Sequence, residues 1–317
     1  MIDTKFKTEP VKEVKVISVS EFAEKLALET VYAGRGNMEL SSISVSRPGL
    51  QLAGYFEHFA NVRVQIIGNA EYEFLRCLPQ KAREKALDEL FKRELPCLIV
   101  ARNLEITDEL AESARRYDCP LFRSPLVTSV LIHDMMVYLN NLFAPTDVMH
   151  GVLLDIAGVG VLITGNAGIG KSETALDLIS RGHRLVADDT VLLKNTGDKI
   201  MGTCPEKIQY FMEVRGIGII NVKSMFGSGA VRPEKSVDLI AELVPWEQIK
   251  DYDRLGDEKL CVDILGIKKQ KLLIPVSPGR NIPIIIETAA RKFRLEQLGY
   301  NAATELVNAT FNKKDTE

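Results

Sequence analysis

The chain contains 317 residues, of which 46% are hydrophobic and 26% are charged, and its formal net charge is −3. This length is enough for two domains with their own cores, and the near balance of charge gives no support to nucleic-acid binding. Because the sequence shows no secretory signal and no apolar run of about 18 residues, we expect a cytoplasmic protein that does not bind membranes.

The first part of the chain alternates short apolar stretches with helical ones. Strands separated by helices are typical of a small α/β layer structure, and we assign residues 1–132 to such a domain. Its sequence contains no catalytic constellation, so we expect a role in assembly or regulation. The predicted strands are 63–67, 97–101 and 120–122, and the predicted helices are 71–78 and 108–117.

A connecting helix is predicted over residues 133–145, because the helical pattern stops before a proline. The remaining residues, 146–317, form a second domain whose core is rich in Val, Ile and Leu. This domain ends in two helical stretches, 287–298 and 302–312. Their apolar side chains either pack against a neighbouring part of the protein or form a docking surface.

Two apolar runs near the start of the second domain predict a hairpin. Residues 151–156 and 161–164 are joined by a glycine turn. Folding this segment about residue 158 places His150 beside Asn166, at the mouth of the loop that follows. The histidine is either part of a site there or merely the cap of a strand.

A complete phosphate-loop pattern, G-x-x-x-x-G-K-S, follows this hairpin and precedes a helical stretch. Strand, glycine-rich turn and helix are the context in which the pattern binds phosphate. Lys171 is predicted to reach the outer phosphates, and the Ser172 hydroxyl is predicted to ligate Mg²⁺. The sequence therefore predicts that the chain binds a nucleoside triphosphate. The loop residues that would cradle its phosphates are Gly165, Asn166, Ala167, Gly168, Ile169 and Gly170.

A pair of carboxylates is predicted to arrive at the same place. The helix after the loop stops at Gly182, and the chain returns through the apolar run 184–187 to Asp188 and Asp189. The returning strand should run parallel to the strand before the loop, so both end at the sheet edge where ligands bind. One carboxylate would hold Mg²⁺ and the other would handle a proton. The alternative is that the two aspartates form a solvated turn.

Several ordered motifs in this chain resemble the HPr kinase/phosphorylase family of low-GC Gram-positive bacteria. The resemblance covers nearly the whole sequence and is far more specific than the phosphate loop alone. At Ser277 the chain departs from the pattern, because related proteins often have arginine there. The motifs are Met149–Asp155, Gly165–Leu176, His183–Asp189, Glu213–Val222, Tyr252–Gly256 and Pro275–Arg280, together with Ser46–Tyr55 in the first domain.

The resemblance implies an α/β protein with two domains, an N-terminal small α/β domain and a C-terminal phosphate-loop catalytic domain. The catalytic domain would resemble the nucleotide-binding core of phosphoenolpyruvate carboxykinase. The implied enzyme uses ATP and Mg²⁺ to phosphorylate a serine of the phosphocarrier protein HPr. It also runs the reverse reaction, in which phosphate attacks the phosphoserine and yields pyrophosphate. Members of the family form homo-hexamers and control carbon catabolite repression. Fructose bisphosphate favours their kinase direction, and phosphate favours the phosphorylase direction.

The resemblance also implies roles for the acidic residues and the histidine. Glu213 would hold Mg²⁺ together with Ser172. Asp189 would take the proton of the serine and return it in phosphorolysis, with Asp188 as the closest rival for that role. His150 would orient this carboxylate or tune its pKa.

Two arginines complete the implied site. Arg254 would stabilise the transferring phosphoryl group through its fork of donors. Arg280 ends a rigid loop and would grip a phosphate, mainly in phosphorolysis. Two competing interpretations stay open. One is a nucleotide sensor without catalysis, and the other is a small-molecule kinase or another carboxykinase-like enzyme that shares the loop.

Overall fold

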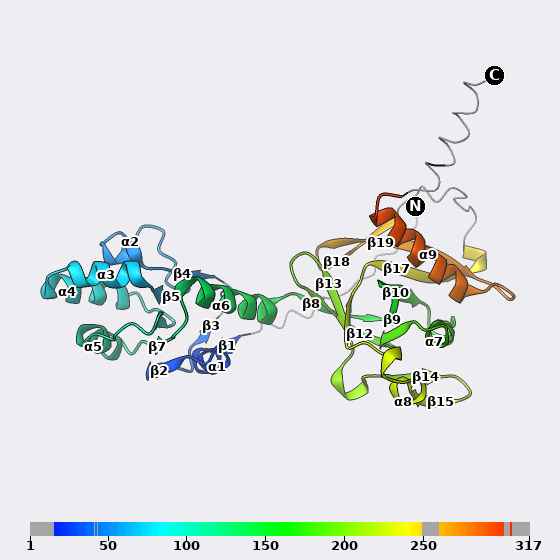
Figure 1. Cartoon of the computed structure of the whole chain (residues 1–317), viewed down its shortest axis with the longest axis horizontal. Helices are drawn as coiled ribbons and strands as arrows, with labels where there is room; N and C mark the ends of the chain where they lie inside the picture. Colours follow the sequence, from blue (N-terminus) through cyan, green and yellow to red (C-terminus); the bar gives the residue numbers. More distant parts are fainter. Residues whose placement is uncertain (1–15, 41, 43, 249–259, 301–304, 306–317) are drawn as a thin grey trace, which may run out of the picture. The chain divides into compact units, whose positions relative to one another are not determined.

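The protein is described by a computed structural model that covers residues 16–40, 42, 44–248, 260–300 and 305. The chain divides into two compact units, which meet in the sequence between Phe143 and Ala144. Each unit contains its own β-sheets (Figure 1). Each also has its own hydrophobic core. This confirms the expectation of two α/β domains. Among the described residues, no helix is long and apolar enough to cross a membrane.

The N-terminal unit is built on a five-stranded sheet with the order β2-β7-β6-β5-β4. Its four neighbours β7, β6, β5 and β4 are parallel, and β2 is antiparallel to β7. The bounds are β2 (Glu29–Tyr32), β4 (Val45–Ser46), β5 (Val64–Ile67), β6 (Leu98–Val100) and β7 (Leu121–Arg123), with a separate pair of β1 (Ile17–Ser18) and β3 (Glu39–Leu40). The predicted strands near 63–67, 97–101 and 120–122 are thus confirmed.

Helices cover both faces of this sheet. β5 and β6 are buried along their whole length, which is why their sequences are continuously apolar rather than alternating. The two resulting cores lie on opposite faces of the sheet. The helices are α1 (Val19–Lys25), α2 (Gly49–Leu52), α3 (Asn69–Cys77), α4 (Gln80–Phe91), α5 (Asp108–Arg116) and α6 (Thr128–Phe143).

Helix α6 occupies most of the segment that the sequence assigned to a connection, 133–145. It begins earlier, at Thr128, and ends at Phe143. Leu131, Met135 and Leu139 follow one another at four-residue spacing and are fully buried in the N-terminal core. This buried stripe makes α6 a structural part of the N-terminal unit.

The C-terminal unit contains a six-stranded sheet with the order β11-β9-β10-β17-β19-β18 and a four-stranded sheet with the order β16-β13-β12-β8. A two-stranded hairpin, β14–β15, stands beside them. The strands are β8 (Thr146–His150), β9 (Val152–Ile156), β10 (Val159–Gly165), β11 (Arg184–Ala187), β12 (Thr190–Asn195), β13 (Ile200–Thr203), β14 (Phe211–Val214), β15 (Gly218–Asn221), β16 (Glu234–Ser236), β17 (Leu239–Pro245), β18 (Leu260–Ile264) and β19 (Ile267–Val276).

The predicted hairpin is present as β9 and β10, which pair antiparallel around the turn at Gly158. β11 pairs antiparallel with β9, so it runs in the same direction as β10, as predicted, but with β9 between them. β10, β17 and β19 are parallel neighbours. The carboxyl ends of β10, β11, β17 and β19 therefore share one edge of the six-stranded sheet.

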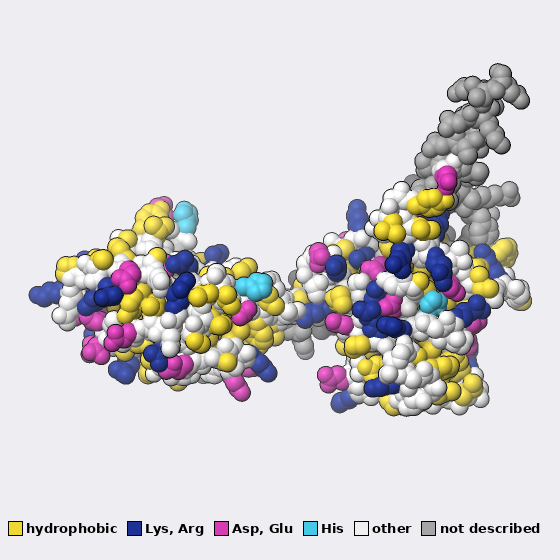
Figure 2. Space-filling model, viewed as in Figure 1, with side chains coloured by type: hydrophobic (Ala, Val, Ile, Leu, Met, Phe, Trp, Pro, Cys, Tyr) yellow, Lys and Arg dark blue, Asp and Glu magenta, His cyan; other side chains and the backbone are white. Residues whose placement is uncertain are grey.

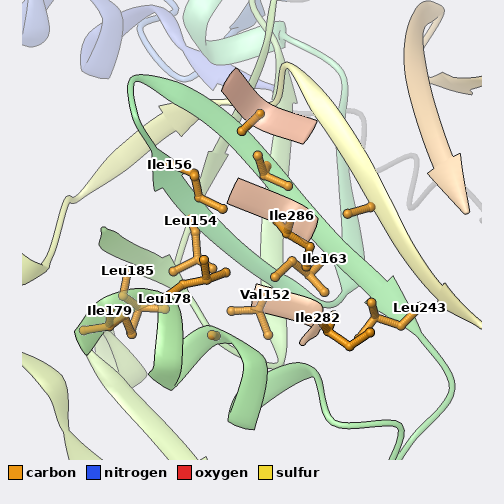
Figure 3. Packing of buried hydrophobic residues seen from close by; sticks show 14 of the residues in the cluster. Val152, Leu154, Ile156, Ile163, Leu178, Ile179, Leu185, Leu243, Ile282 and Ile286 are labelled. Atoms are coloured by element: carbon orange, nitrogen blue, oxygen red, sulfur yellow. The ribbon is translucent and has the colours of Figure 1, made fainter. Parts of the chain in front are cut away.

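Two helices cover one face of this sheet, and their apolar side chains form its main core (Figure 3). Leu178 of one helix and Ile286 of the other are both fully buried against strands β9 and β10. The opposite face packs on the four-stranded sheet. The helices are α7 (Lys171–Ser180), α8 (Val222–Phe226) and α9 (Ile282–Gln297), with short 3₁₀ turns at Glu206–Ile208, Ser228–Ala230 and Trp246–Gln248.

Helix α9 confirms the first of the two terminal helices predicted from sequence, but it starts before residue 287. Asn281 caps it, because its side-chain oxygen accepts the Ile284 N–H at 3.2 Å. A proline in the first turn suits this position, where no N–H is needed. The second predicted helix, 302–312, lies almost entirely outside the described residues.

Candidate active site

The loop between β10 and α7 has the backbone that phosphate binding requires. Gly165, Gly168 and Gly170 have φ values of 137°, 78° and 99°, which glycine adopts without the strain that a side chain would cause. Among the residues that the structure describes, no side chain caps the start of α7. The first N–H groups of that helix, at the positive end of its dipole, are thus directed at the space above the loop.

Lys171 is held at this loop by two hydrogen bonds. Its Nζ donates to the carbonyl oxygens of Gly165 at 3.0 Å and Asn166 at 3.1 Å. The ammonium group therefore lies against the loop, and its contact with the outer phosphates stays a prediction.

Asp188 lies behind the start of α7 and is nearly buried, with 6% of its surface exposed. Its carboxylate accepts the Ser172 hydroxyl at 3.1 Å and the backbone N–H of Glu213 at 3.3 Å. Burial raises the pKa of Asp188 above its ordinary value, and the hydrogen bonds from Ser172 and Glu213 oppose that shift. Asp188 thus connects the phosphate loop with strand β14.

Asp189 has the opposite environment, although it is the next residue. Its side chain is 83% exposed, and its backbone is in the left-handed region with φ of 62°, which aspartate tolerates better than most residues. A tight turn, in which the Thr190 N–H donates to the Asp188 carbonyl at 2.7 Å, separates the two carboxylates. The dipeptide therefore supplies one buried carboxylate and one exposed carboxylate at the same sheet edge.

His150 lies beside Asp189 and is not part of the β9–β10 hairpin. The histidine ends β8 in the four-stranded sheet, where it pairs with Thr190 of β12, and its Nδ1 lies 4.0 Å from Asp189 Oδ1. The chain passes between the two sheets at Gly151, where an added Cβ would lie 2.6 Å from the Ile163 carbonyl oxygen. The placement of His150 beside Asn166 assumed one uninterrupted strand, and this crossing between sheets is the feature that the sequence did not reveal.

The phosphate loop, Lys171 and the two aspartates line a pocket of about 280 Å³. It collects the loop, both aspartates and the hairpin residue Glu213 in one space, and so confirms that the two aspartates and the loop share one edge. The lining residues are Ala167, Gly168, Gly170, Lys171, Ser172, Glu173, Asp188, Asp189, Glu213 and Arg215.

Arg215 is a member of this pocket that sequence reasoning missed. Its guanidinium lies against the loop, because a Cβ added to Gly168 would be 3.0 Å from Arg215 Nη2. A signal was available: Arg215 follows strand β14 two residues after Glu213, and alternate residues of an extended segment face the same side. The pocket therefore contains a second cation besides Lys171.

The oxygen atoms of the pocket fit a magnesium ion. Mg²⁺ is usually held by one or two carboxylates, with phosphate oxygens and water completing its shell. Ser172, Asp188 and Glu213 provide hard oxygen donors at this pocket. Within the described residues, no group of three or more His, Cys, Asp or Glu is placed to hold a metal ion.

Arg280 lies in the loop after β19, which leaves the sheet at the same edge as the phosphate loop. Its Nη1 donates to the Pro275 carbonyl oxygen at 3.3 Å, and its guanidinium carbon is 5.7 Å from the centre of the Trp246 ring. Trp246, Arg280 and the residues 277–279 line a separate pocket of about 500 Å³. Arg254, the other predicted arginine, lies outside the described residues.

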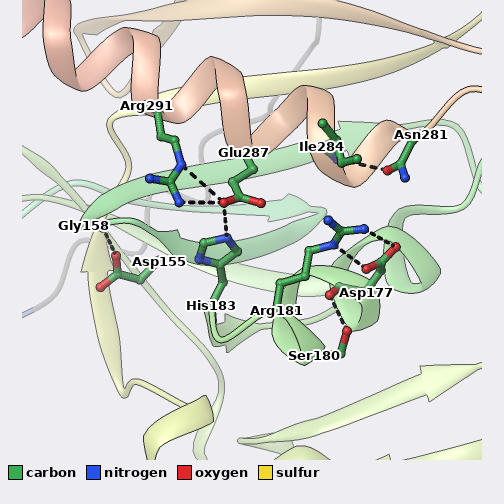
Figure 4. A network of polar contacts seen from close by, with 10 residues as sticks. All are labelled: Asp155, Gly158, Asp177, Ser180, Arg181, His183, Asn281, Ile284, Glu287 and Arg291. Carbon is green, nitrogen blue, oxygen red and sulfur yellow. Dashed lines mark hydrogen bonds and ion pairs between the residues drawn. The ribbon is translucent and has the colours of Figure 1, made fainter.

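His183, which ends the α7 region, takes part in a polar network rather than in the pocket (Figure 4). The residue is 8% exposed, and its Nε2 lies 3.7 Å from Glu287 Oε1 of helix α9. Arg291 binds the same carboxylate at 2.7 Å. The pKa of Glu287 is lowered, mainly by this contact with Arg291 and to a smaller extent by His183. His183 thus connects the segment that follows α7 with helix α9, and it does not line the pocket above the phosphate loop.

Comparison with known proteins gives one consistent result. The model of the HPr serine kinase C-terminal domain matches residues 141–310, and the model of the HPr serine kinase N terminus matches residues 17–139. An HPr kinase/phosphorylase from Peptoclostridium acidaminophilum is 43% identical over 304 residues, which cover 95% of this chain and 98% of that protein.

Two further relatives have the same description. The protein from Caldanaerobacter subterraneus subsp. tengcongensis is 46% identical over 92% of this chain and 96% of its own length. The Bacillus subtilis protein is 43% identical over 92% of this chain and 95% of its own length. A solved structure, the Hpr(Ser) kinase/phosphatase from Coxiella burnetii, is 42% identical and covers 50% of this chain and 98% of that chain, with a TM-score of 0.47.

Proposed function

Because this chain belongs to the HPr kinase/phosphorylase family, we propose that its phosphate-loop pocket transfers a phosphoryl group from ATP to a serine of HPr. The same pocket would work in reverse, with phosphate attacking the phosphoserine to give pyrophosphate. The observation that carries this proposal is the pocket itself, where Lys171 and the loop amides meet one buried and one exposed aspartate. Phosphoryl transfer depends mainly on such alignment and charge neutralisation.

The exposed carboxylate suits a serine that arrives on the surface of another protein. Asp189 would accept the hydroxyl proton as the serine oxygen attacks the γ-phosphorus of ATP, and the bond from that phosphorus to ADP would break. His150, 4.0 Å away, would orient the Asp189 carboxylate. A kinase for a small molecule would instead be expected to enclose its acceptor, and a nucleotide sensor would need neither residue.

The buried side of the pocket would hold the donor. Lys171 and the loop amides would clamp the phosphates of ATP, and Arg215 would neutralise charge on the same chain of phosphates. Arg254 would stabilise the transferring phosphoryl group. Ser172, Asp188 and Glu213 would hold Mg²⁺, which neutralises phosphate charge when bound.

In the reverse direction, an oxygen of inorganic phosphate would attack the phosphorus of phosphoserine. The new P–O–P bond would form pyrophosphate, and the serine oxygen would leave with the proton returned by Asp189. Arg280 would grip the incoming phosphate at the edge where its loop emerges.

The proposal extends to the properties that the family resemblance implies. They include a nucleotide-binding core like that of phosphoenolpyruvate carboxykinase, a homo-hexamer and a location in the cytoplasm. They also include control of carbon catabolite repression, with fructose bisphosphate and phosphate as opposing effectors.

The test uses purified HPr and the Asp189→Asn variant. We expect wild-type protein with ATP and Mg²⁺ to form phosphoserine-HPr, and we expect the variant to lose about 100-fold or more in rate in both directions while it still binds ATP. A Thr190→Ser variant serves as the matched control at the next position. Appreciable turnover by Asp189→Asn in either direction would reject the role of this carboxylate, and no phosphorylation of HPr by wild-type protein would reject the function.

A further inference from the structure

The pocket at the phosphate loop has the groups that phosphates need but no surface for the base of a nucleotide. Its described lining consists of small, hydroxyl and charged residues and contains no aromatic side chain. The planar ring of a base is bound most effectively by stacking on an aromatic face. A nucleotide held by the phosphate loop therefore requires a second surface for its base, within reach of that loop.

A pocket of about 500 Å³ lies at the same edge of the six-stranded sheet. Trp246, which directly follows β17, and residues 277–280, which follow β19, line it. β17 is the parallel neighbour of β10, and its Leu243 pairs with Gly165 of the phosphate loop. Because neighbouring strands are about 4.8 Å apart, this pocket begins about 5–10 Å to the side of the loop. The α-phosphate and ribose of a nucleotide can bridge that separation.

The walls of this second pocket are flat. Trp246 is 46% exposed, and the Arg280 guanidinium carbon lies 5.7 Å from the centre of its ring. The bond from Arg280 Nη1 to the Pro275 carbonyl oxygen at 3.3 Å holds the guanidinium in place. Pro278 adds a rigid ring to the lining. Indole and guanidinium planes are the protein surfaces on which aromatic ligands stack.

The space beside these walls is open and carries little charge. A Cβ added to Gly279 would meet no atom of the described residues within 4 Å. Figure 2 shows hydrophobic side chains at the surface of the C-terminal unit near the turn that follows β17. Arg280 is the one charged residue in the described lining, and Ser277 adds a hydroxyl that can donate or accept a hydrogen bond. An uncharged ring with polar atoms at its edge fits such a lining better than a second phosphate chain does.

From these observations we infer that Trp246 and residues 277–280 form the subsite that binds the base of ATP, while the phosphate loop holds its phosphates. The inference rests on the proposed function for the identity of the donor. It gives Trp246 a role in one direction of the reaction only. HPr phosphorylation uses a nucleotide, whereas phosphorolysis uses phosphate and yields pyrophosphate, neither of which has a base.

The test separates the base from the phosphates by comparing two ligands. ATP and inorganic triphosphate both carry a chain of three phosphates, but only ATP has a nucleoside. Binding of each ligand to the full chain with Mg²⁺ is measured by titration calorimetry. Trp246→Ala removes the stacking surface, and Trp246→Phe keeps an aromatic face. Phe74→Ala, which removes an exposed ring from α3 of the N-terminal unit, is the matched control.

We expect Trp246→Ala to bind ATP about tenfold more weakly than wild-type protein, because loss of an aromatic platform has about this effect on the binding of one base. Its affinity for triphosphate should stay within about twofold of wild type. Trp246→Phe and Phe74→Ala should bind both ligands within about threefold of wild type. Unchanged ATP binding by Trp246→Ala, an equal loss for ATP and triphosphate, or no ATP binding by wild-type protein would overturn the assignment.

The two directions of the reaction give an independent readout. Trp246→Ala should raise the KM for ATP in HPr phosphorylation about tenfold with little change in kcat, and it should change the rate of phosphorolysis by less than about threefold. A matching loss in phosphorolysis would contradict a role that is limited to the base. If wild-type protein does not phosphorylate HPr, the proposed function fails, and the calorimetric comparison still decides whether the base binds at Trp246.

Discussion

Two helices in this molecule begin at a glycine that follows a buried parallel strand, and their N-termini have different partners. At α3, the Glu71 carboxylate accepts the Gly68 N–H at 3.0 Å and the Arg47 guanidinium at 2.7 Å. At α7, which starts after Gly170, no side chain of the described part of the chain caps the helix. The N-terminal unit thus supplies an anion of its own to the start of α3, which we call the closed terminus. The start of α7, which we call the open terminus, has the uncapped N–H groups that binding of a phosphate would require.

The largest expected effect comes from removing the cation at the open terminus. Lys171→Ala should lower kcat/KM for HPr phosphorylation and for phosphorolysis by about 100-fold or more, because the phosphate chain loses its clamp. Thermal unfolding should be unaffected, since the ammonium contacts only loop carbonyls. The rates in both directions and the Tm are measured. Near-wild-type rates would show that Lys171 does not act on the phosphates at the start of α7.

Asp188→Asn should lose about 100-fold in activity and gain stability. The buried carboxylate has a raised pKa, so ionising it costs free energy in the folded state that an amide avoids, while the amide oxygen can still accept a hydrogen bond from Ser172 or Glu213. The measurements are kcat and the free energy of unfolding at neutral pH. A variant that is both inactive and less stable would contradict the claim that the buried Asp188 carboxylate lowers the stability of the protein while it serves the activity.

The same carboxylate gives a pH dependence with a definite sign. Because its pKa is higher in the folded state than the ordinary 3.8, its contribution favours folding at low pH. That contribution is lost as pH rises from about the ordinary value through the raised one. The stability difference between Asp188→Asn and wild type should therefore grow with pH over this interval, and denaturant unfolding at several pH values measures it. A difference that shrinks with pH would reverse the assigned sign.

The open terminus was predictable from the sequence because its determinants are local. The phosphate-loop pattern, the hairpin before it and the return of the chain to Asp188 and Asp189 all depend on spacing and on the handedness of crossover connections. The structure confirms each of these elements. The separate roles assigned to the two aspartates stay a prediction.

Features that depend on pairing between distant parts of the chain could not be predicted. β9 lies between β10 and β11, and His150 leaves the hairpin for the other sheet, because the close approach at Gly151 is visible only in three dimensions. Arg215 was missed although its two-residue spacing from Glu213 was a signal, because its contact with Gly168 joins residues far apart in the chain. The start of α6 was missed because a buried helix stripe and a linker helix look alike without the core beside them.

A smaller effect is expected at Arg280, whose loop leaves the six-stranded sheet at the same edge as the phosphate loop. Arg280→Lys keeps the charge but loses the forked donor set, so phosphorolysis should fall about tenfold and the kinase rate should fall by less. Separate assays of the two directions at saturating HPr decide the matter. Equal losses in both directions would contradict a role of Arg280 that is specific to the incoming phosphate of phosphorolysis.

The smallest effect is expected at the closed terminus. Glu71→Ala should lower the free energy of unfolding by about 1–2 kcal/mol, because the Gly68 N–H and Arg47 lose their buried acceptor, and it should leave phosphoryl transfer unchanged. Glu73→Ala, whose side chain is 60% exposed in its pair with Arg76, is the control and should change stability by less than about 0.5 kcal/mol. Loss of activity in Glu71→Ala would show that the two termini are not independent.

The central claim is that one pocket at the open terminus moves a phosphoryl group in both directions between HPr and a chain of phosphates. Its most direct test supplies wild-type protein with phosphoserine-HPr labelled on its phosphoryl group, together with Mg²⁺ and unlabelled phosphate, and separates the products. The account predicts that the label appears in pyrophosphate and that Lys171→Ala abolishes this product. Label released only as orthophosphate would show hydrolysis by water and would contradict the account.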